Sequence, residues 1–356
     1  MNDNIKLPNI WNKWNPEICD RDIYLNFDRS KNPFGSTIIS RIGSASADAE
    51  VYHIRFDGVD FALKIMPRID DDSEQKNINE INIAKHADDM PRHFPMVFGH
   101  GTTNRFTSND SPLFKKAEEY HCYTTLSEQL STKRQKLEFI HSYKEGTTLT
   151  DLIERFDLNP CVPKTITADY LISELANGDM GTWMNGDHLI TDWKIILFDV
   201  ISGIYYMSTT LKKAHSDLHP GNILIIEKTP KCDITALIHD FGRAIEVIDS
   251  IPITYITGLI SFCTEFLGAS KRTDLIVPSI IKQAIRQIYD SISSIDNNTL
   301  DINNIDNIYK KALMIIKGIP TKRKFHCKGR TMSKGRKGIR KSRRSRRKTR
   351  SSHKHA

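Results

Sequence analysis

The sequence predicts an α+β protein with a small antiparallel sheet and one helix near its N-terminus, followed by a mostly helical C-terminal part. Two observations carry this prediction. Strand-like alternation gathers between Ser36 and Met66, and beyond Gly242 the pattern is mainly helical. The chain has 356 residues, of which 39% are hydrophobic, so it is long enough for each part to bury a core.

Three stretches near the N-terminus alternate as strands do: 36–46, 50–58 and 59–66. Asp57 and Gly58 predict a tight hairpin turn between the second and the third stretch. A helix is expected over 74–90, because Asp70 and the residues after it supply N-cap candidates and Ile78, Ile81 and Ile83 recur at roughly helical spacing. The predicted order is therefore three strands and then one helix.

Residues from about 104 to 168 are less regular and are expected to form an insertion. Within it, LEFIHSY (137–143) favours a strand and LTDLIERF (149–156) a helix. The elements expected after the insertion are a buried strand over 168–176, an amphipathic helix over 192–213, and short strands at 222–227 and 234–242. Helices should then continue to about Lys317, where Gly318 and Pro320 break the pattern.

Charge is distributed unevenly along the chain. Residues 321–356 hold 17 of the 51 lysines and arginines and no Asp or Glu, which leaves 34 basic against 43 acidic residues in 1–320. The positive net charge of the whole chain therefore belongs to the tail, and only the tail suggests a nucleic-acid partner.

The six cysteines are widely scattered, without a C-x-x-C pair or a cysteine–histidine cluster of metal-site spacing. Neither a disulfide framework nor a zinc site is expected, and a reducing compartment is the default. The N-terminus lacks an apolar signal segment, and the most apolar long stretch, 193–211, is interrupted by Asp199. We therefore expect a soluble intracellular protein with no transmembrane segment.

Two short motifs carry the chemistry of the sequence. HSDLHPGN at 215–222 is followed by HDFG at 239–242, and together they resemble the catalytic loop, H-x-D-x-x-x-x-N, and the D-F-G motif of protein kinases. The resemblance implies that Asp217 is the catalytic carboxylate, which orients the attacking hydroxyl and accepts its proton. It also implies that Asn222 and Asp240 hold Mg²⁺ on the phosphates of ATP.

The resemblance extends upstream. FALK at 61–64 is similar to the V-A-I-K strand of kinases, so Ala62 is expected against the nucleotide and Lys64 on its α- and β-phosphates. The partner of this lysine is a glutamate on the next helix. Glu80 is preferred because it lies mid-helix, whereas Glu74 lies in the first turn and could simply favour the helix dipole.

The glycine-rich loop of kinases is poorly matched. The segment from Gly43 to Val51 contains one glycine, and counting back from Val51 puts Ser44, Ser46 and Ala49 in the glycine positions. Small residues let backbone N–H groups approach phosphates, but they reach positive φ less freely than glycine. This loop is expected to bind nucleotide weakly, and a plain turn without any nucleotide contact is the alternative.

SELANG at 173–178 resembles the hinge between the two lobes of a kinase. Adenine would then bond backbone groups of Glu174 and Ala176, and Ser173 would occupy the gatekeeper position. Because a hydroxymethyl group is small, ATP analogues with bulky N6 substituents are expected to be accepted.

Several departures limit the resemblance. Ser216 replaces the arginine of H-R-D, so regulation by phosphorylation of an activation loop is not expected. His219 stands where serine/threonine kinases usually have lysine, and no A-P-E motif follows Gly242. The catalytic loop also resembles that of small-molecule kinases of the aminoglycoside and choline type, which keeps such an enzyme open as an alternative.

The tail beyond Pro320 has no apolar periodicity, is expected to be disordered on its own, and could bind nucleic acid through phosphate contacts without sequence specificity. A nuclear localisation signal, an acidic or membrane-surface partner, or a simply solvated charge run are the alternatives. Four serines among its arginines, Ser342, Ser345, Ser351 and Ser352, could be phosphorylated.

The sequence thus predicts a bilobal protein kinase-like fold. Its expected parts are an N-terminal extension (1–35), an N-lobe with the insertion (36–171), a hinge and C-lobe (172–318) and the basic tail (319–356). The predicted function is transfer of the γ-phosphoryl group of ATP, with Mg²⁺, to serine or threonine hydroxyls of a protein substrate. The overall style resembles divergent serine/threonine kinases of large cytoplasmic DNA viruses, which implies a location in the host cytoplasm or virion. The basic tail adds the nucleus as an alternative location. A pseudokinase that binds nucleic acid through its tail is a further alternative.

Overall fold

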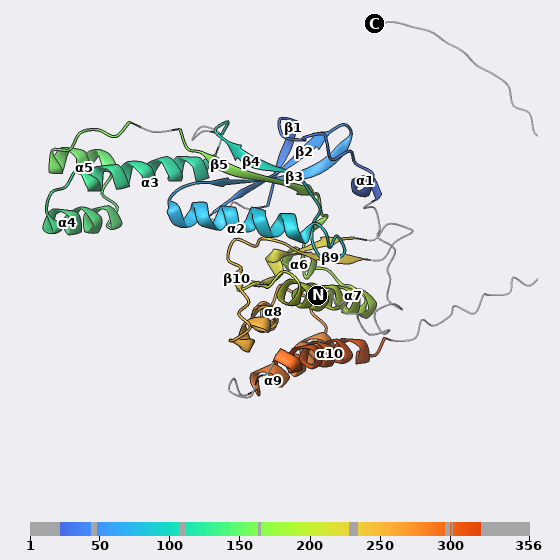
Figure 1. Ribbon diagram of the computed structural model, residues 1–356. Helices are drawn as coiled ribbons and strands as arrows, with labels where there is room; N and C mark the ends of the chain where they lie inside the picture. The colour runs from blue at the N-terminus through green and yellow to red at the C-terminus, as the bar shows by residue number, and fades with distance from the viewer. Residues whose placement is uncertain are drawn as a thin grey trace, which may run out of the picture. The chain divides into compact units, whose positions relative to one another are not determined.

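The computed structural model describes residues 22–43, 48–106, 111–162, 165–227, 234–295, 300 and 302–321. Its contacts divide the chain into two units, Met1–Pro320 and Thr321–Ala356, and every element below belongs to the first unit. The chain is α+β, with an antiparallel five-stranded sheet and a set of helices (Figure 1). The predictions for the tail beyond Thr321 and for Ser44 and Ser46 lie outside the described residues.

The five-stranded sheet is antiparallel throughout, in the order β1-β2-β3-β5-β4. Its strands are β1 (Thr37–Ile42), β2 (Glu50–Phe56), β3 (Val59–Pro67), β4 (Val97–Thr103) and β5 (Ala168–Glu174). The hairpin between β2 and β3 turns at Asp57 and Gly58, whose φ angles of +49° and +79° are those that favour Asp-Gly in such a turn.

The strand β4 was not predicted from the sequence. Its residues, VFGHGTT, show no clear alternation and include two glycines. The glycine at 101 is required by packing, because a Cβ there would lie 3.0 Å from the ring of Tyr170 on β5. The glycine in this strand is thus explained by close packing against the neighbouring strand, which a single sequence does not show, and it interrupts the alternation by which strands are usually predicted.

The helix α2 (Asp71–Ala87) begins with a capping box, in which Asp70 accepts from Ser73 N and the Ser73 hydroxyl bonds the backbone of Asp70. The predicted helix is confirmed, but its predicted apolar face is wrong in part. Ile78 is 37% exposed, whereas the buried face contains the polar residues Asn77 and Glu80. Polar side chains occupy this face because each has a buried partner, described below.

The segment between β4 and β5 forms three helices: α3 (Pro112–Glu128), α4 (Lys133–Lys144) and α5 (Leu149–Phe156). They enclose a small hydrophobic cluster of their own, which contains Leu126, Leu130, Phe139 and Leu152. The strand predicted at 137–143 is wrong, since these residues belong to α4. A capping box between Thr132 and Gln135 starts this helix, and the buried residues Phe139 and Ser142 follow helical spacing.

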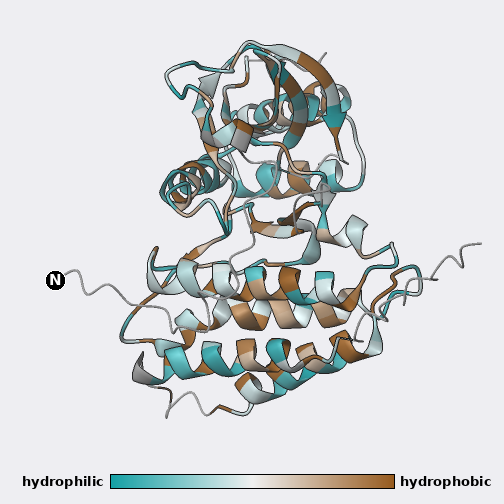
Figure 2. Cartoon of the chain, turned by 90° about the vertical axis from the view of Figure 1, so that its right-hand side faces the viewer, coloured by the Kyte–Doolittle hydropathy of each residue, from teal (hydrophilic) through white to brown (hydrophobic). Residues whose placement is uncertain are grey.

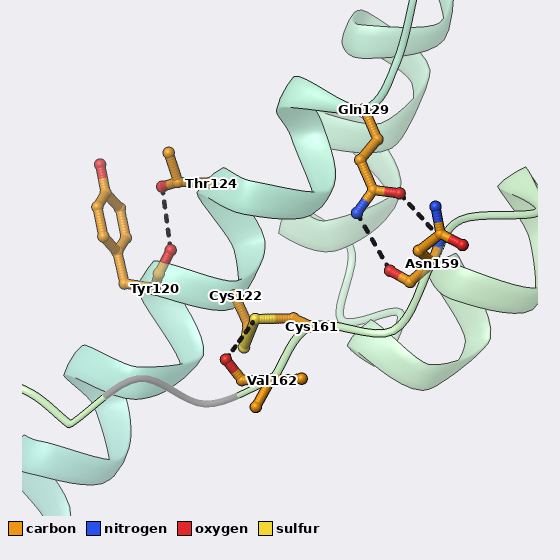
Figure 3. The surroundings of a disulfide bond; sticks show 7 residues. All are labelled: Tyr120, Cys122, Thr124, Gln129, Asn159, Cys161 and Val162. Carbon is orange, nitrogen blue, oxygen red and sulfur yellow. Dashed lines mark hydrogen bonds between the residues drawn. A yellow bond between two sulfur atoms is a disulfide. The ribbon is translucent and has the colours of Figure 1, made fainter.

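A disulfide closes this three-helix insertion, so the expectation that no cysteines pair is wrong. Figure 3 shows Cys122 on α3 bonded to Cys161, which follows α5 and lies 39 positions further along the chain. Beside it, Gln129 and Asn159 exchange two hydrogen bonds, Gln129 Nε2 to the Asn159 carbonyl at 3.1 Å and Asn159 N to Gln129 Oε1 at 2.9 Å. The pairing spans distant positions that carry no recognisable spacing.

The remaining elements follow β5 or precede β1. They are α1 (Asp22–Leu25), β6 (Gly178–Asp179), α6 (Met180–Trp183), α7 (Ile190–Thr209), β7 (Lys213–Ala214), η1 (Pro220–Asn222), β8 (Ile223–Ile226), β9 (Thr235–Ile238), β10 (Ile245–Glu246), η2 (Pro252–Tyr255), α8 (Thr257–Ala269), α9 (Ser279–Ser293) and α10 (Ile302–Gly318). Figure 2 shows hydrophobic residues interleaved with hydrophilic ones on both strands and helices.

The helix α7 is buried on nearly every side, so the amphipathic helix predicted from the sequence is present in position but not in character. It contacts β9, α8 and α10, and its Lys194 donates to the carbonyls of Lys317 and Ile319 at 2.8 and 2.9 Å, which caps the C-terminal end of α10. Within the described residues, no helix is both long enough and apolar enough to cross a membrane.

Candidate active site

Lys64 is held in the middle of the sheet by its strand register. On β3 it lies between Val51 of β2 and Leu171 of β5, and its side chain reaches α2, where Nζ lies 2.6 and 2.8 Å from the two carboxylate oxygens of Glu80. A third bond of 3.1 Å joins it to Asp240. Two segments far apart in the sequence thus meet at one lysine.

Glu74, the other candidate partner, lies elsewhere. Its carboxylate pairs with Arg68, which also binds the buried Asp169 of β5 at 2.9 and 2.7 Å. Asn77 joins the same network by donating to Asp169 at 3.2 Å. This network fixes the N-terminal half of α2 against the sheet, and Glu80, almost two turns beyond Glu74, faces the lysine.

The electrostatics of this cluster follow from burial and charge. Burial acts to lower the pKa of Lys64, but the adjacent carboxylates of Glu80 and Asp240 outweigh it and raise that pKa above its usual range. Burial raises the pKa of Glu80 to about 7, against the opposing charge of the lysine. Burial also acts to raise the pKa of Asp240, yet the charge of Lys64 prevails and holds it below its usual range. Lys64 and Asp240 are therefore charged at neutral pH.

Asp217 is positioned by backbone contacts of its own loop, which runs between β7 and β8. Asn222 donates its side-chain amide to the carbonyl of Asp217 at 2.8 Å, and Leu218 N donates to Ser261 of α8 at 2.9 Å. His215 lies beneath, with Nε2 3.0 Å from the carbonyl of His239. Burial lowers the pKa of His215, so this contact is made by a neutral ring.

Asp240 adopts a φ of +64°, a left-handed conformation that non-glycine residues rarely use. The neighbouring Phe241 is buried against Phe94, with ring centroids 5.9 Å apart, and Asn79 on α2 donates to the carbonyl of Ala244 at 3.1 Å. These contacts hold the strained turn and aim the carboxylate at Lys64.

Five of the side chains described above line one cavity of about 340 Å³. The residues predicted from the sequence that it brings together are Lys64, Glu80, Asp217, Asn222 and Asp240. Ala49, which the sequence puts in a glycine position of the phosphate loop, lines the cavity as well, whereas Gly43, Val51, Ala62, Glu174 and Ala176 do not. Val51 pairs with the cavity residue Lys64 across the strands, and Ala62 lies two residues before Lys64 on β3.

Three charged residues that line the cavity were not predicted: Asp48, Lys76 and Arg243. Arg243, directly after the D-F-G motif, places Nη1 3.2 Å from the carboxylate of Asp217 and Nη2 3.9 Å from that of Asp48. Its backbone carbonyl accepts the hydroxyl of Ser216, the residue that replaces the arginine of H-R-D. The position of Arg243 directly after D-F-G was the signal in the sequence that could have indicated a cavity residue. That its guanidinium contacts Asp217 is shown only by the folded chain.

The donor set suits a cation held jointly with phosphates. Asn222 and Asp240 offer an amide oxygen and a carboxylate, and in the described part of the chain no group of three or more His, Cys, Asp or Glu could hold a metal ion alone. Mg²⁺ is commonly bound by one or two protein oxygens together with phosphates and water. These residues therefore fit a nucleotide-associated Mg²⁺.

Comparison with known proteins finds no matching family model and no matching curated protein.

Proposed function

We propose that the protein is an ATP- and Mg²⁺-dependent phosphotransferase with a bilobal, kinase-like arrangement, and that its acceptors are serine and threonine hydroxyls of proteins. The observation that carries the proposal is the convergence of Lys64, Glu80, Asp217, Asn222 and Asp240 on one cavity. A lysine paired with a helix glutamate, beside two oxygen ligands and a separate carboxylate, is the set that phosphoryl transfer requires.

Each residue has a separate task in this proposal. Lys64, oriented by Glu80, would bind the phosphates of ATP, and Asn222 with Asp240 would hold Mg²⁺, which neutralises phosphate charge when bound. The side chain of Asp217 also lines the cavity and is 36% exposed, so that an incoming hydroxyl could reach it. Catalysis then depends on positioning and on fixed charges rather than on a covalent intermediate.

A protein acceptor is favoured over a small alcohol by a second hollow next to the first. This open cavity of about 570 Å³ adjoins His219 and lies between α6 and α8, with the carboxylates of Asp179 and Glu265 on its lining. A small molecule needs no such extension, whereas a polypeptide on either side of the reacting hydroxyl does.

The direct test is transfer from labelled ATP with Mg²⁺ to casein, histone and a panel of small alcohols. Wild type should label protein serine or threonine, and Asp217→Asn should lower the rate about 10³-fold or more. Asp187→Asn, an exposed aspartate outside the cavity, is the matched control and should keep full activity. Label only on small alcohols would move the assignment to a small-molecule kinase, and no transfer by wild type would favour a pseudokinase scaffold.

Nucleic-acid binding by the basic tail is a separate proposal that rests on its 17 positive charges alone. Each phosphate contact should contribute a slope of roughly −0.7 to −0.9 to the dependence of log affinity on log salt. Binding of a fluorescent DNA of arbitrary sequence, measured from 50 to 300 mM salt with the full chain and with a chain ending at Pro320, tests it. Equal affinity of the two chains would refute it.

A further inference from the structure

Arg243 is more exposed than either lysine of the cavity. Its side chain is 59% exposed, and its guanidinium bridges two carboxylates from different parts of the chain, Asp217 of the loop before β8 and Asp48 just before β2. The side chains of Asp217 and Asp48 are 36% and 61% exposed, so both ion pairs are open to solvent. Ion pairs this exposed are worth little in water, which leaves the guanidinium free to exchange partners.

The lysines at the cavity have partners other than Asp217. Lys64 is buried and bonded to Glu80 and Asp240, and Lys76 pairs with Asp72 at 2.6 Å, one turn away on α2. His219 accepts the N–H of Gly221 on Nδ1 at 3.0 Å, so this nitrogen is already used within its own loop. Among the described residues that line the cavity, Arg243 is therefore the cation that contacts Asp217.

The position matters because charge develops there during transfer. In the proposed reaction the acceptor oxygen forms a bond to the γ-phosphorus while the bond from phosphorus to the bridging oxygen of ADP breaks. The hydroxyl proton passes to Asp217, and the negative charge spreads over the three remaining phosphoryl oxygens. A planar guanidinium next to Asp217 matches these oxygens in geometry and charge, and it neither gains nor loses a proton.

We infer that Arg243 binds the phosphoryl group in transfer, and that Asp217 and Asp48 hold the guanidinium until the nucleotide arrives. The inference rests on the proposed function and adds a residue that contacts the reacting group. On binding ATP, the guanidinium exchanges the carboxylate of Asp217 for phosphate oxygens. This exchange also releases Asp217 to accept a hydrogen bond from the acceptor hydroxyl, so one movement prepares both reactants.

The test compares Arg243→Gln and Arg243→Lys with wild type as full chains. Arg55→Gln is the matched control, because Arg55 is 54% exposed, pairs with an aspartate at 2.6 Å and does not line the cavity. Calorimetry with Mg²⁺ gives affinities for ADP and for a non-hydrolysable ATP analogue. Arg243→Gln should weaken analogue binding about 10-fold and leave ADP binding within about 2-fold, since ADP lacks the γ-phosphate.

Single-turnover transfer by Arg243→Gln should fall about 10²-fold or more, as when one charge-stabilising group is removed from a transition state. Arg243→Lys should recover part of the analogue affinity and less of the rate, because it restores charge without the planar fork. Equal losses of ADP and analogue affinity, or unchanged analogue binding with an unchanged or faster rate, would overturn the inference.

The two proposals fail in different ways. A wild type that binds neither nucleotide refutes the proposed function and this inference together. A wild type that binds both nucleotides without transferring phosphate refutes the phosphotransferase, and the ratio of analogue to ADP affinity in Arg243→Gln still decides whether Arg243 contacts the γ-phosphate.

Discussion

The two ends of the cavity differ in how firmly their charges are enclosed. At one end, Lys64 and Glu80 expose 15% and 6% of their side chains, and each is fixed by a neighbouring strand or helix. At the other end, Arg243 and Asp217 expose 59% and 36%. When a buried ion pair separates, an unpaired charge is left in surroundings of low polarity, which is costly. An exposed ion pair exchanges partners at little cost because water solvates both charges. The buried end is suited to hold a ligand and the exposed end to respond to it.

Loss of Lys64 should have the largest effect, because it leaves the buried Glu80 without its partner. Lys64→Met should abolish transfer and destabilise the fold by about 3–5 kcal/mol when Glu80 is ionised. Glu80 has a raised pKa, so folding favours its protonated form, and the stability contributed by protonation disappears as the pH rises through the folded pKa. The loss measured by urea unfolding should therefore be larger at pH 9 than at pH 6.

Two variants sharpen this prediction. Lys64→Met combined with Glu80→Gln should recover much of the stability and none of the activity, because it removes the stranded charge. Lys31→Met removes a lysine from an exposed pair with Asp57 and should leave the urea midpoint unchanged. Equal shifts of the urea midpoint in Lys64→Met and Lys31→Met would show that the buried pair contributes no more to stability than the exposed pair.

Low pH should destabilise the protein through a buried histidine, His239, next to Asp240. Burial lowers the pKa of His239, the residue before Asp240, to about 4 from an ordinary 6.5. As the pH falls from about 6.5 to about 4, the unfolded histidine takes up its proton first, so the folded state loses about 3 kcal/mol through this residue. His239→Gln should reduce the loss of stability over this range, measured by urea unfolding at a series of pH values.

The exposed His86 on α2 provides the control for this measurement. His86→Gln should lose stability with acid just as wild type does. An unchanged acid profile in His239→Gln would show that the buried ring does not couple folding to pH.

The insertion tests whether the site depends on distant structure. Replacing Cys122 and Cys161 by serine should destabilise the insertion by about 2–4 kcal/mol, because the unfolded chain regains the freedom of a long loop. The insertion has a hydrophobic cluster of its own, so ADP affinity should stay within about 2-fold of wild type. Limited proteolysis combined with calorimetry measures both quantities, and a parallel loss of ADP binding would show that the two regions are coupled.

The smallest expected effect concerns Ser173 at the end of β5. Its hydroxyl bonds only the neighbouring carbonyl of Glu174, at 3.4 Å, among the contacts described for it. ATP analogues with bulky N6 groups should be used at rates within about 10-fold of ATP, and Ser173→Met should reject them while keeping ATP, because the larger side chain fills the space. Rejection of the analogues by wild type would refute the open gatekeeper position.

Local patterns were enough to predict much of this protein. Alternation and the Asp57-Gly58 turn predicted the first three strands, the N-cap at Asp70 predicted α2, and motif spacing selected Asp217, Asn222 and Asp240. Each of these signals lies within a few residues of the structure it specifies. The sequence alone therefore determined the fold class, most of the helices and strands, and several of the residues that line the cavity.

Only the tertiary structure decided how distant residues meet. The glycine-rich β4, the helical state of 137–143 and the Cys122–Cys161 bond all depend on packing against partners far along the chain. Glu80 rather than Glu74 pairs with Lys64, because Glu74 is held by Arg68, and the guanidinium of Arg243 lies beside Asp217 although the two lie 26 positions apart along the chain. Burial and charge pairing are properties of three-dimensional neighbours, which the order of residues does not display.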